Sequence, residues 1–275
     1  MIDSHTHSKY SKHGIGEIEE IIISAIKQNI KILTITDHAP FPIDQNNRLS
    51  IDELKYYFED INFVKSKYSK DIKILKGLEA DFKPKYESYI RNLIKNMELD
   101  FLIGSVHSIF IKNKPMNIWD IANIHNPEFI NKYFLYLEGL INSELFNSIG
   151  HPDAILRGGI NEDIFYEKFL PLIDNMKKSK ISYELNTSGL RKSSFNIHKN
   201  IKENRWNFPS KSIIPELVNN NISFTIGSDS HKPDDINSGI QDILIIAKNL
   251  TVSEISYYDN QKIIKVNIDN LIKGK

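Results

Sequence analysis

The sequence of 275 residues contains no cysteine. Without thiols the chain has neither a disulfide framework nor a thiolate metal site, so metal ligands must be imidazole nitrogens and carboxylate oxygens. Ligands of this kind suit zinc, manganese or iron. The chain also lacks an excess of charge of either sign, because 35 lysines and arginines balance 35 aspartates and glutamates. This balance, together with the lack of a basic stripe, argues against a nucleic-acid partner.

Long apolar runs are missing as well. No run approaches the roughly 20 residues that a membrane-spanning helix needs, so no membrane partner is expected. The first apolar segment starts at Met1 or Ile2 and leaves no room for a signal peptide, which predicts a cytoplasmic location. The length of 275 residues suits a single domain over 1–275. Nothing in the sequence indicates the oligomeric state.

The sequence is instead marked by histidines in short motifs. Of its nine histidines, all but His125 and His198 lie in such motifs, and these two, in polar loops, are expected to be ordinary exposed side chains. The first motif is Asp3-Ser4-His5-Thr6-His7, and Ser11-Lys12-His13-Gly14 follows it. On a strand, His5 and His7 point to the same face, so both imidazoles can reach one cation.

Five further motifs each follow an apolar, β-branched segment. They are Thr36-Asp37-His38-Ala39-Pro40, Gly77-Leu78-Glu79-Ala80-Asp81, Gly104-Ser105-Val106-His107-Ser108, Gly150-His151-Pro152-Asp153 and Gly227-Ser228-Asp229-Ser230-His231. Three of their glycines, Gly104, Gly150 and Gly227, precede a histidine or aspartate by one to three residues. This spacing fits either a close backbone approach near a metal site or ordinary turn chemistry.

Alternating apolar and helical segments predict an α/β fold. Strands are expected at about 1–7, 31–37, 72–79, 100–107, 146–151, 181–186 and 222–228. Helical periodicity separates them, for example over 18–28 and 52–68. Because polar motifs follow successive strand ends, we expect a distorted TIM-like (β/α)7 barrel with its active site at the carboxyl ends of the strands. An open doubly wound sheet is the alternative.

The sequence also predicts structure for segments outside these strands. Residues 254–266 are expected to form a peripheral hairpin, and Tyr133, Phe134 and Tyr136 to lie on a helix that packs on the barrel. The polar stretches 111–126 and 188–212 contain Trp119 and Trp206. Both leave strand ends on the expected active-site face, so they are candidates for loops that shape the substrate site.

The order of these motifs resembles the polymerase-and-histidinol-phosphatase (PHP) family of metal-dependent phosphoesterases over nearly the whole chain. Within the family, Gly104 to His107, Glu184 to Arg191 and Gly227 to Pro233 look most like the stand-alone histidinol-phosphate phosphatases. The resemblance implies a metal-dependent phosphomonoesterase of histidine biosynthesis that hydrolyses L-histidinol phosphate to L-histidinol and phosphate. A water shared between cations would be the nucleophile in such chemistry.

The resemblance also implies a centre of three divalent metal ions. The first would be held by His5, His7, Glu79 and Asp229; Glu79 would bridge to a second, held with His107 and His151; the third would be held by His13, His38 and His231. By position in the family pattern and by their guanidinium chemistry, Arg157 and Arg191 are expected to bind the phosphoryl group.

The motifs leave more than one role open for several carboxylates near these positions. Asp3, Asp37 and Asp153 lie within two residues of a proposed ligand and either orient an imidazole or cap a helix or loop. Asp81 could act in the same way, but it alternates onto the side of Glu79, so direct proximity to the site is the alternative. The ammonium group of the proposed substrate needs an acceptor, for which Asp120, Asp234 and Asp235 are candidates that the sequence does not distinguish.

Three other functions remain open at this point. The site could act on another small phosphate ester or on a nucleic-acid end, although the neutral charge weakens the latter. Metal-dependent amide or ring hydrolysis is a second alternative, but that barrel superfamily usually has eight strands and a bridging modified lysine. A metal-binding scaffold without catalysis is a third, against which the complete set of nine ligand positions counts.

Overall fold

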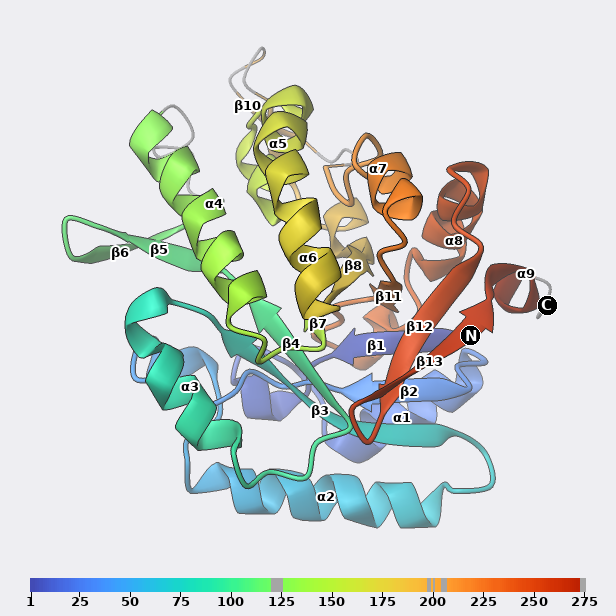
Figure 1. Cartoon of the computed structure of the whole chain (residues 1–275). Helices are drawn as coiled ribbons and strands as arrows, with labels where there is room; N and C mark the ends of the chain where they lie inside the picture. Colours follow the sequence, from blue (N-terminus) through green and yellow to red (C-terminus); the bar gives the residue numbers. More distant parts are fainter. Residues whose placement is uncertain (120–125, 197–198, 200, 204–206, 273–275) are drawn as a thin grey trace.

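Seven parallel strands form the central sheet of the computed structural model, which describes residues 1–119, 126–196, 199, 201–203 and 207–272 (Figure 1). In spatial order they are β1 (Ile2–Thr6), β2 (Ile32–Ile35), β3 (Lys73–Asp81), β4 (Phe101–Ser105), β7 (Ser148–Ile149), β8 (Ser182–Asn186) and β11 (Phe224–Gly227). Each strand pairs in parallel with the next. Six of them lie within the segments that the sequence predicts, and β3 extends two residues past the predicted end at residue 79.

Backbone hydrogen bonds join the two outer strands of this sheet just beyond the end of β11. The amide of His7 donates to the carbonyl of Ser230 at 2.8 Å, and the amide of Asp229 donates to the carbonyl of His5 at 2.8 Å. The sheet is therefore a nearly closed barrel, and the predicted distorted seven-stranded barrel is confirmed. The same closure brings the motifs after the first and the last strand into contact.

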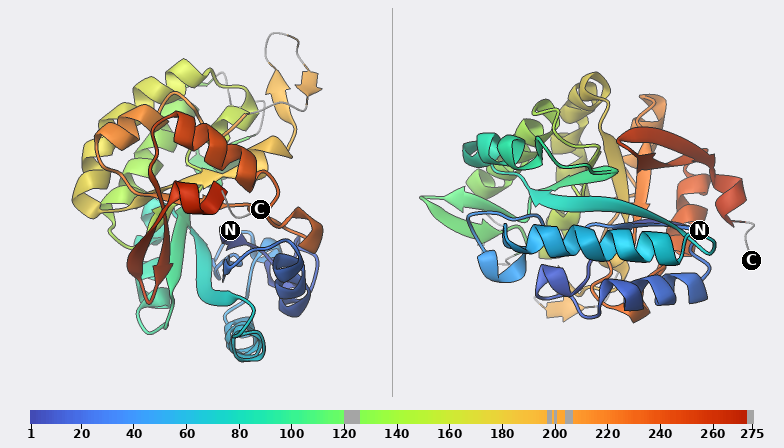
Figure 2. Two further views of the ribbon diagram at one scale, coloured as in Figure 1. Left: turned by 90° about the vertical axis from the view of Figure 1, so that its right-hand side faces the viewer. Right: turned by 90° about the horizontal axis from the view of Figure 1, so that it is seen from below.

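Helices cover the outside of the barrel (Figures 1 and 2). They are α1 (Ile18–Lys27), α2 (Glu53–Lys67), α3 (Glu87–Ile94), α4 (Pro127–Asn142), α5 (Glu162–Phe169), α6 (Ile173–Ser179), α7 (Ile214–Asn219), α8 (Ile240–Asn249) and α9 (Ile268–Ile272). In α1 the buried residues Ile18, Ile21, Ile22 and Ala25 recur with helical spacing, which directs one apolar face to the sheet. Tyr133, Phe134 and Tyr136 are likewise buried on α4, as predicted.

A hairpin of β12 (Glu254–Asp259) and β13 (Lys262–Asn267) occupies the range in which the sequence predicts one. Tyr258 stacks on Phe101 with ring centroids 5.2 Å apart. Its hydroxyl contacts Ser182 Oγ at 2.8 Å and donates to the carbonyl of Asn147 at 3.0 Å. These partners lie at the starts of β4, β8 and β7, so the hairpin covers the amino-terminal end of the barrel, which the left view of Figure 2 faces.

The two long connections contain short hairpins of their own. β5 (Ser108–Ile111) pairs with β6 (Lys114–Asn117), and β9 (Ser194–Asn196) pairs with β10 (Ile201–Glu203). Neither pair was expected from these polar stretches. Asp120, His125, His198 and Trp206 lie outside the described residues. Among the described residues, no helix combines the length and the apolar character needed to span a membrane.

Candidate metal centre and active site

The end of β1 places two imidazoles side by side. His5 and His7 are both fully buried, and their Nε2 atoms lie 3.0 Å apart. Thr6, between them, points the other way and donates from Oγ1 to the carbonyl of Thr34 at 2.9 Å. The alternation of a strand therefore produces the paired geometry that the sequence motif predicts.

Glu79, near the end of β3, lies at the middle of the cluster. Its side chain is fully buried, and five imidazole nitrogens lie within 3.4 Å of its carboxylate. Oε2 faces His5 Nε2 at 3.3 Å, His7 Nε2 at 3.4 Å and His38 Nδ1 at 2.9 Å. Oε1 faces His151 Nε2 at 3.0 Å and His107 Nε2 at 3.4 Å. A carboxylate that presents each oxygen to a different set of imidazoles has the arrangement that bridging between two cations requires.

Asp229 and His231 complete the cluster from the loop after β11. Asp229 Oδ1 lies 3.4 Å from His7 Nε2 and 3.5 Å from His231 Nδ1. His231 Nε2 in turn lies 2.9 Å from Nε2 of His13, which is at the exposed edge of the cluster. The ring of His13 also stacks on His38, with centroids 5.2 Å apart. The structure thus brings together all nine side chains proposed as metal ligands.

The donor atoms of this cluster could hold metal ions in four overlapping groups. These are His5, His7 and Asp229; His5, Glu79 and His151; His38, Glu79 and His107; and His7, His38 and His231. Nδ1 of His38 and Oε2 of Glu79 are both buried and make no hydrogen bond, although they lie 2.9 Å apart. Because unsatisfied buried polar atoms are costly, a cation between such atoms fits this site. The nitrogen and oxygen donors suit first-row divalent ions.

The pKa shifts of three proposed ligands favour cation binding. Burial lowers the pKa of His7 to about 3, with the nearby His38 adding to the effect, and burial likewise lowers the pKa of His38 to about 4. Burial alone would raise the pKa of Glu79, but the imidazoles of His5, His107 and His38 hold it well below its usual range. At neutral pH, His7 and His38 therefore offer free lone pairs and Glu79 is charged, which is the state that metal binding needs.

Glu184, on β8, orients two members of the cluster. Its Oε1 lies 2.6 Å from Nδ1 of His5, and its Oε2 accepts from the amide of His151 at 2.7 Å and from Nδ2 of Asn186 at 3.1 Å. Burial lowers the pKa of His5, but the charges of Glu184 and Glu79 outweigh it and raise that pKa well above normal. Sequence analysis did not assign this role to Glu184. The sequence signal that could have indicated this role is a charged residue within an otherwise apolar strand.

Asp81 orients His107 from the end of β3. Its Oδ1 lies 2.5 Å from Nδ1 of His107, and its Oδ2 accepts from Nη2 of Arg48 at 2.9 Å. The ammonium of the buried Lys83 lies 3.7 Å from the same Oδ2. Two cations thus hold the carboxylate that faces the imidazole. Burial lowers the pKa of His107, but the charges of Asp81 and Glu79 outweigh it and raise that pKa to about 9. Asp81 therefore both lies near the site and orients an imidazole, the two roles that the motifs leave open for it.

The other three aspartates bind loops and not imidazoles. Asp3 accepts from the amide of Ser228 at 2.8 Å, and Asp37 accepts from the amide and the hydroxyl of Ser8 and from the hydroxyl of Ser11. Asp153 accepts from the hydroxyl of Tyr183 and the amide of Ser210. The interpretation that each orients an imidazole directly is therefore wrong. They fix the loops on which the proposed ligands lie.

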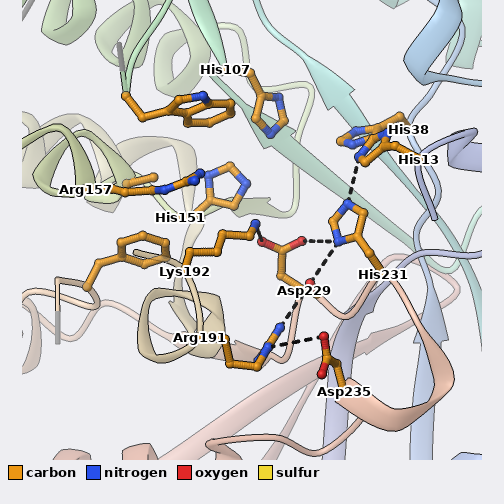
Figure 3. A pocket seen from close by; sticks show the side chains of 13 residues that line it. His13, His38, His107, His151, Arg157, Arg191, Lys192, Asp229, His231 and Asp235 are labelled. Carbon is orange, nitrogen blue, oxygen red and sulfur yellow. Dashed lines mark hydrogen bonds and ion pairs between the residues drawn. The ribbon is translucent and has the colours of Figure 1, made fainter. Parts of the chain in front are cut away.

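A cavity of about 430 Å³ opens above the cluster (Figure 3). Its lining residues are His13, His38, His107, Trp119, His151, Ala154, Arg157, Arg191, Lys192, Phe208, Asp229, His231 and Asp235. Of the aspartates considered for the substrate ammonium, Asp235 lines the cavity and Asp234 does not. The cavity therefore combines a candidate metal floor with cationic, aromatic and carboxylate walls.

The two arginines proposed to bind phosphate have different surroundings. Arg157 donates from Nε to the carbonyl of Ser193 at 3.1 Å, and its guanidinium lies 5.4 Å from the ring centroid of Trp119. Among the described residues, its two terminal nitrogens donate no hydrogen bond. Arg191 donates from Nη2 to the carbonyl of Ser228 at 2.6 Å. Both arginines line the cavity, but of the two only Arg157 has terminal nitrogens without an acceptor among the described residues.

The comparison with known families agrees with this geometry. A family model described as the PHP domain matches residues 3–188. The chain belongs to the PHP family. The membership expected from the order of the motifs is confirmed.

Several proteins similar to this chain carry related names. A protein of Deinococcus radiodurans named probable histidinol-phosphatase is 27% identical over 251 residues, covering 86% of this chain and 88% of that protein. A protein of the same name from Clostridium acetobutylicum is 26% identical over 269 residues, covering 94% and 96%. The structure of histidinol phosphate phosphatase from Lactococcus lactis, complexed with zinc, L-histidinol and phosphate, has a TM-score of 0.79 at 21% identity and covers 96% of this chain and 98% of that chain. This likeness shows that the fold is shared.

Two of the motif glycines in this PHP chain allow close backbone approach. A Cβ atom on Gly227 would lie 2.3 Å from Cβ of His5 and 2.6 Å from Oε1 of Glu184. A Cβ atom on Gly150 would lie 2.3 Å from Oγ of Ser105. Neither residue has a positive φ, so the reason for glycine is space at the site and not turn conformation.

Replacing Asp81 tests its effect on His107. We expect Asp81→Asn to lower metal affinity or activity about tenfold, because partners that orient a metal-binding imidazole typically contribute 10- to 100-fold. Metal titration and phosphate release would measure the two effects, with the exposed Asp71→Asn as the control. Wild-type values in Asp81→Asn would show that the contact with His107 has no such role.

Proposed function

We propose that this PHP-family protein is a metal-dependent phosphomonoesterase that hydrolyses L-histidinol phosphate to L-histidinol and phosphate. The observation that carries the proposal is the carboxylate of Glu79, buried among five imidazoles beneath a cavity that also contains Arg157. The names of the relatives from Deinococcus and Clostridium support the same substrate. The proposal includes a cytoplasmic location and a single domain over 1–275.

In this proposal three divalent ions, of zinc, manganese or iron, occupy the cluster. His5, His7, Glu79 and Asp229 hold the first; Glu79, His107 and His151 hold the second; His13, His38 and His231 hold the third. Bound there, such ions would acidify a water to make a nucleophile and neutralise the oxygens of the phosphoryl group. Glu184 and Asp81 hold His5 and His107 in orientation, so little rearrangement is needed before binding.

The walls of the cavity suit the remaining parts of this substrate. Trp119 and Phe208 offer aromatic surfaces next to which an imidazole ring can lie. Asp235 offers a carboxylate that suits an ammonium group. Arg157 presents two terminal nitrogens to a phosphoryl group. These features match the aromatic, cationic and anionic groups of histidinol phosphate.

Metal removal tests the proposed chemistry. We expect the purified protein to release phosphate from L-histidinol phosphate, to lose this activity on dialysis against a chelator, and to regain it with added Zn²⁺ or Mn²⁺. Elemental mass spectrometry of the same samples would follow bound metal. Undiminished phosphate release from protein shown to be free of metal would contradict the proposal, since the described chain would then need another source of nucleophile and positive charge.

A further inference from the structure

The guanidinium of Arg191 is largely occupied by neighbouring acceptors. Nη2 donates to the carbonyls of Ser228 and Asp229 at 2.6 and 3.3 Å. Nη1 donates to the carbonyl of Ser238 at 3.3 Å and contacts Oγ1 of Thr187 at 3.5 Å. An arginine has five N–H donors. Four of them face these acceptors, and the fifth, on Nε, lies 3.7 Å from Oδ2 of Asp235. Arg191 therefore ties the segment after β8 to the loop after β11 and has no fork left for a phosphoryl group.

The next residue, Lys192, has the opposite character. Its ammonium lies 3.3 Å from Oδ2 of Asp229, and its side chain lines the cavity (Figure 3). The side chain is 36% exposed. An ammonium has three donors. Among the hydrogen bonds and ion pairs of the described residues, the ammonium of Lys192 has one acceptor, the carboxylate of Asp229. The remaining donors of Lys192 are free to reach a ligand in the cavity.

Lys192 and Arg157 are also connected through the backbone. Arg157 donates from Nε to the carbonyl of Ser193, the residue after Lys192, at 3.1 Å. Nδ2 of Asn207 donates to the carbonyl of Lys192 at 3.1 Å. These two bonds fix the peptide carbonyls on both sides of Ser193. The backbone next to Lys192 is thus tied to the side chain of Arg157, and both cations line the same cavity.

We propose that Lys192 acts with Arg157 in binding the phosphoryl group of the substrate, while Arg191 positions the loop that carries Asp229. This rests on the proposed phosphatase function and revises which cation contacts the phosphoryl oxygens. A compact ammonium and a planar guanidinium both bind phosphate through charge-assisted hydrogen bonds. The contact of Lys192 with Asp229 places its ammonium at the edge of the metal cluster, where a phosphoryl group would also bind.

A role limited to balancing the charge of Asp229 does not account for the placement of Lys192. Oδ2 of Asp229 already accepts from the hydroxyl of Ser188 at 2.8 Å, and Oδ1 faces the imidazoles of His7 and His231. A counter-charge would serve equally well if it were enclosed by protein. Lys192 instead approaches from the cavity side, which it lines together with Arg157 and His151.

Inhibition by inorganic phosphate tests this assignment without depending on the natural substrate. With p-nitrophenyl phosphate as the reporter and saturating metal, we expect Lys192→Met to raise the inhibition constant of phosphate about 10- to 100-fold, the loss expected for one charged hydrogen bond. Metal content should stay at the wild-type level, and Lys192→Arg should recover part of the affinity. Lys55→Met, on an exposed cation of α2, should match the wild type.

Arg191→Met provides the contrasting variant. Because Arg191 positions a loop, its replacement should lower the thermal midpoint and kcat while changing the inhibition constant of phosphate less than Lys192→Met does. An unchanged phosphate constant in Lys192→Met would overturn the assignment, as would a loss of bound metal in that variant. If Lys192→Met does not fold, Lys192→Gln is measured in its place by the same criteria.

Failure of the proposed function gives a different result from failure of this assignment. If the wild type hydrolyses no phosphate ester with any metal, the phosphatase proposal fails. Calorimetric titration of the metal-loaded protein with inorganic phosphate then still compares Lys192→Met with the wild type. Equal phosphate affinities, or no phosphate binding by either protein, would overturn the role of Lys192, and a selective loss in the variant would support it.

Discussion

Glu79→Gln is expected to lower kcat for phosphate release more than about 100-fold and to abolish tight binding of at least one metal ion. Partners that only orient a metal ligand contribute up to about 100-fold, and Glu79 is proposed to be a ligand itself. Each of its oxygens faces a separate group of imidazoles. Glutamine keeps the shape of the side chain but removes the charge and replaces one oxygen with an amide NH₂.

Metal content and steady-state kinetics, measured on the same preparation, would check this expectation. Circular dichroism would confirm that the variant is folded. The exposed Glu59→Gln, on α2, removes the same charge far from the cluster and should behave as the wild type. A folded Glu79→Gln protein with full metal content and normal turnover would exclude a bridging role for this carboxylate.

Glu184→Gln is expected to have the second largest effect, a loss of 10- to 100-fold in metal affinity or in kcat/KM. The carboxylate lies 2.6 Å from Nδ1 of His5, which directs Nε2 of that ring toward Glu79 and His7. It also accepts from the amide of His151. Removing the charge weakens both contacts and leaves His5 less strongly oriented.

Competition with a chromogenic chelator would measure the metal affinity of Glu184→Gln. The matched control is Glu216→Gln, which changes a partly buried glutamate that contacts the hydroxyl of Tyr166 away from the cavity. Equal metal affinity and kcat/KM in Glu184→Gln and the wild type would show that His5 needs no support from this residue.

The barrel and the clustering of the motifs could be predicted because both depend on local patterns. A strand alternates its side chains whatever surrounds it, so His5 and His7 had to share a face. Parallel strands in a barrel bring their carboxyl ends to one rim, so residues as distant in sequence as His38 and His231 could be placed at one site. Asp81 followed from Glu79 by the same alternation.

The contacts between loops could not be predicted, because they depend on how distant segments pack. Asp3, Asp37 and Asp153 lie beside proposed ligands in the sequence, yet their carboxylates bind loop amides and hydroxyls. Arg191 and Lys192 are adjacent residues with different environments, since carbonyls from the loop after β11 occupy only the arginine. No sequence pattern specifies which of two neighbouring cations finds such acceptors.

The contacts that the hairpin makes at the amino-terminal end of the barrel could not be predicted from the sequence either. Alternating residues around a turn predict β12 and β13, but not the stacking of Tyr258 on Phe101 or the amides of Asn260 and Gln261 that donate to Asp100. These contacts join the last part of the chain to strands that begin more than 100 residues earlier. Only the folded structure reveals that the hairpin covers one end of the barrel.

The most direct test of the central claim is the kcat/KM of the metal-loaded protein for L-histidinol phosphate, compared with sugar phosphates, nucleotides and p-nitrophenyl phosphate. The proposed function predicts a value for L-histidinol phosphate far above the others. Similar values across the panel would contradict the assigned substrate while keeping the phosphoesterase chemistry. No turnover of any ester with Zn²⁺, Mn²⁺ or Fe²⁺ would contradict the enzyme function itself and favour a metal-binding scaffold.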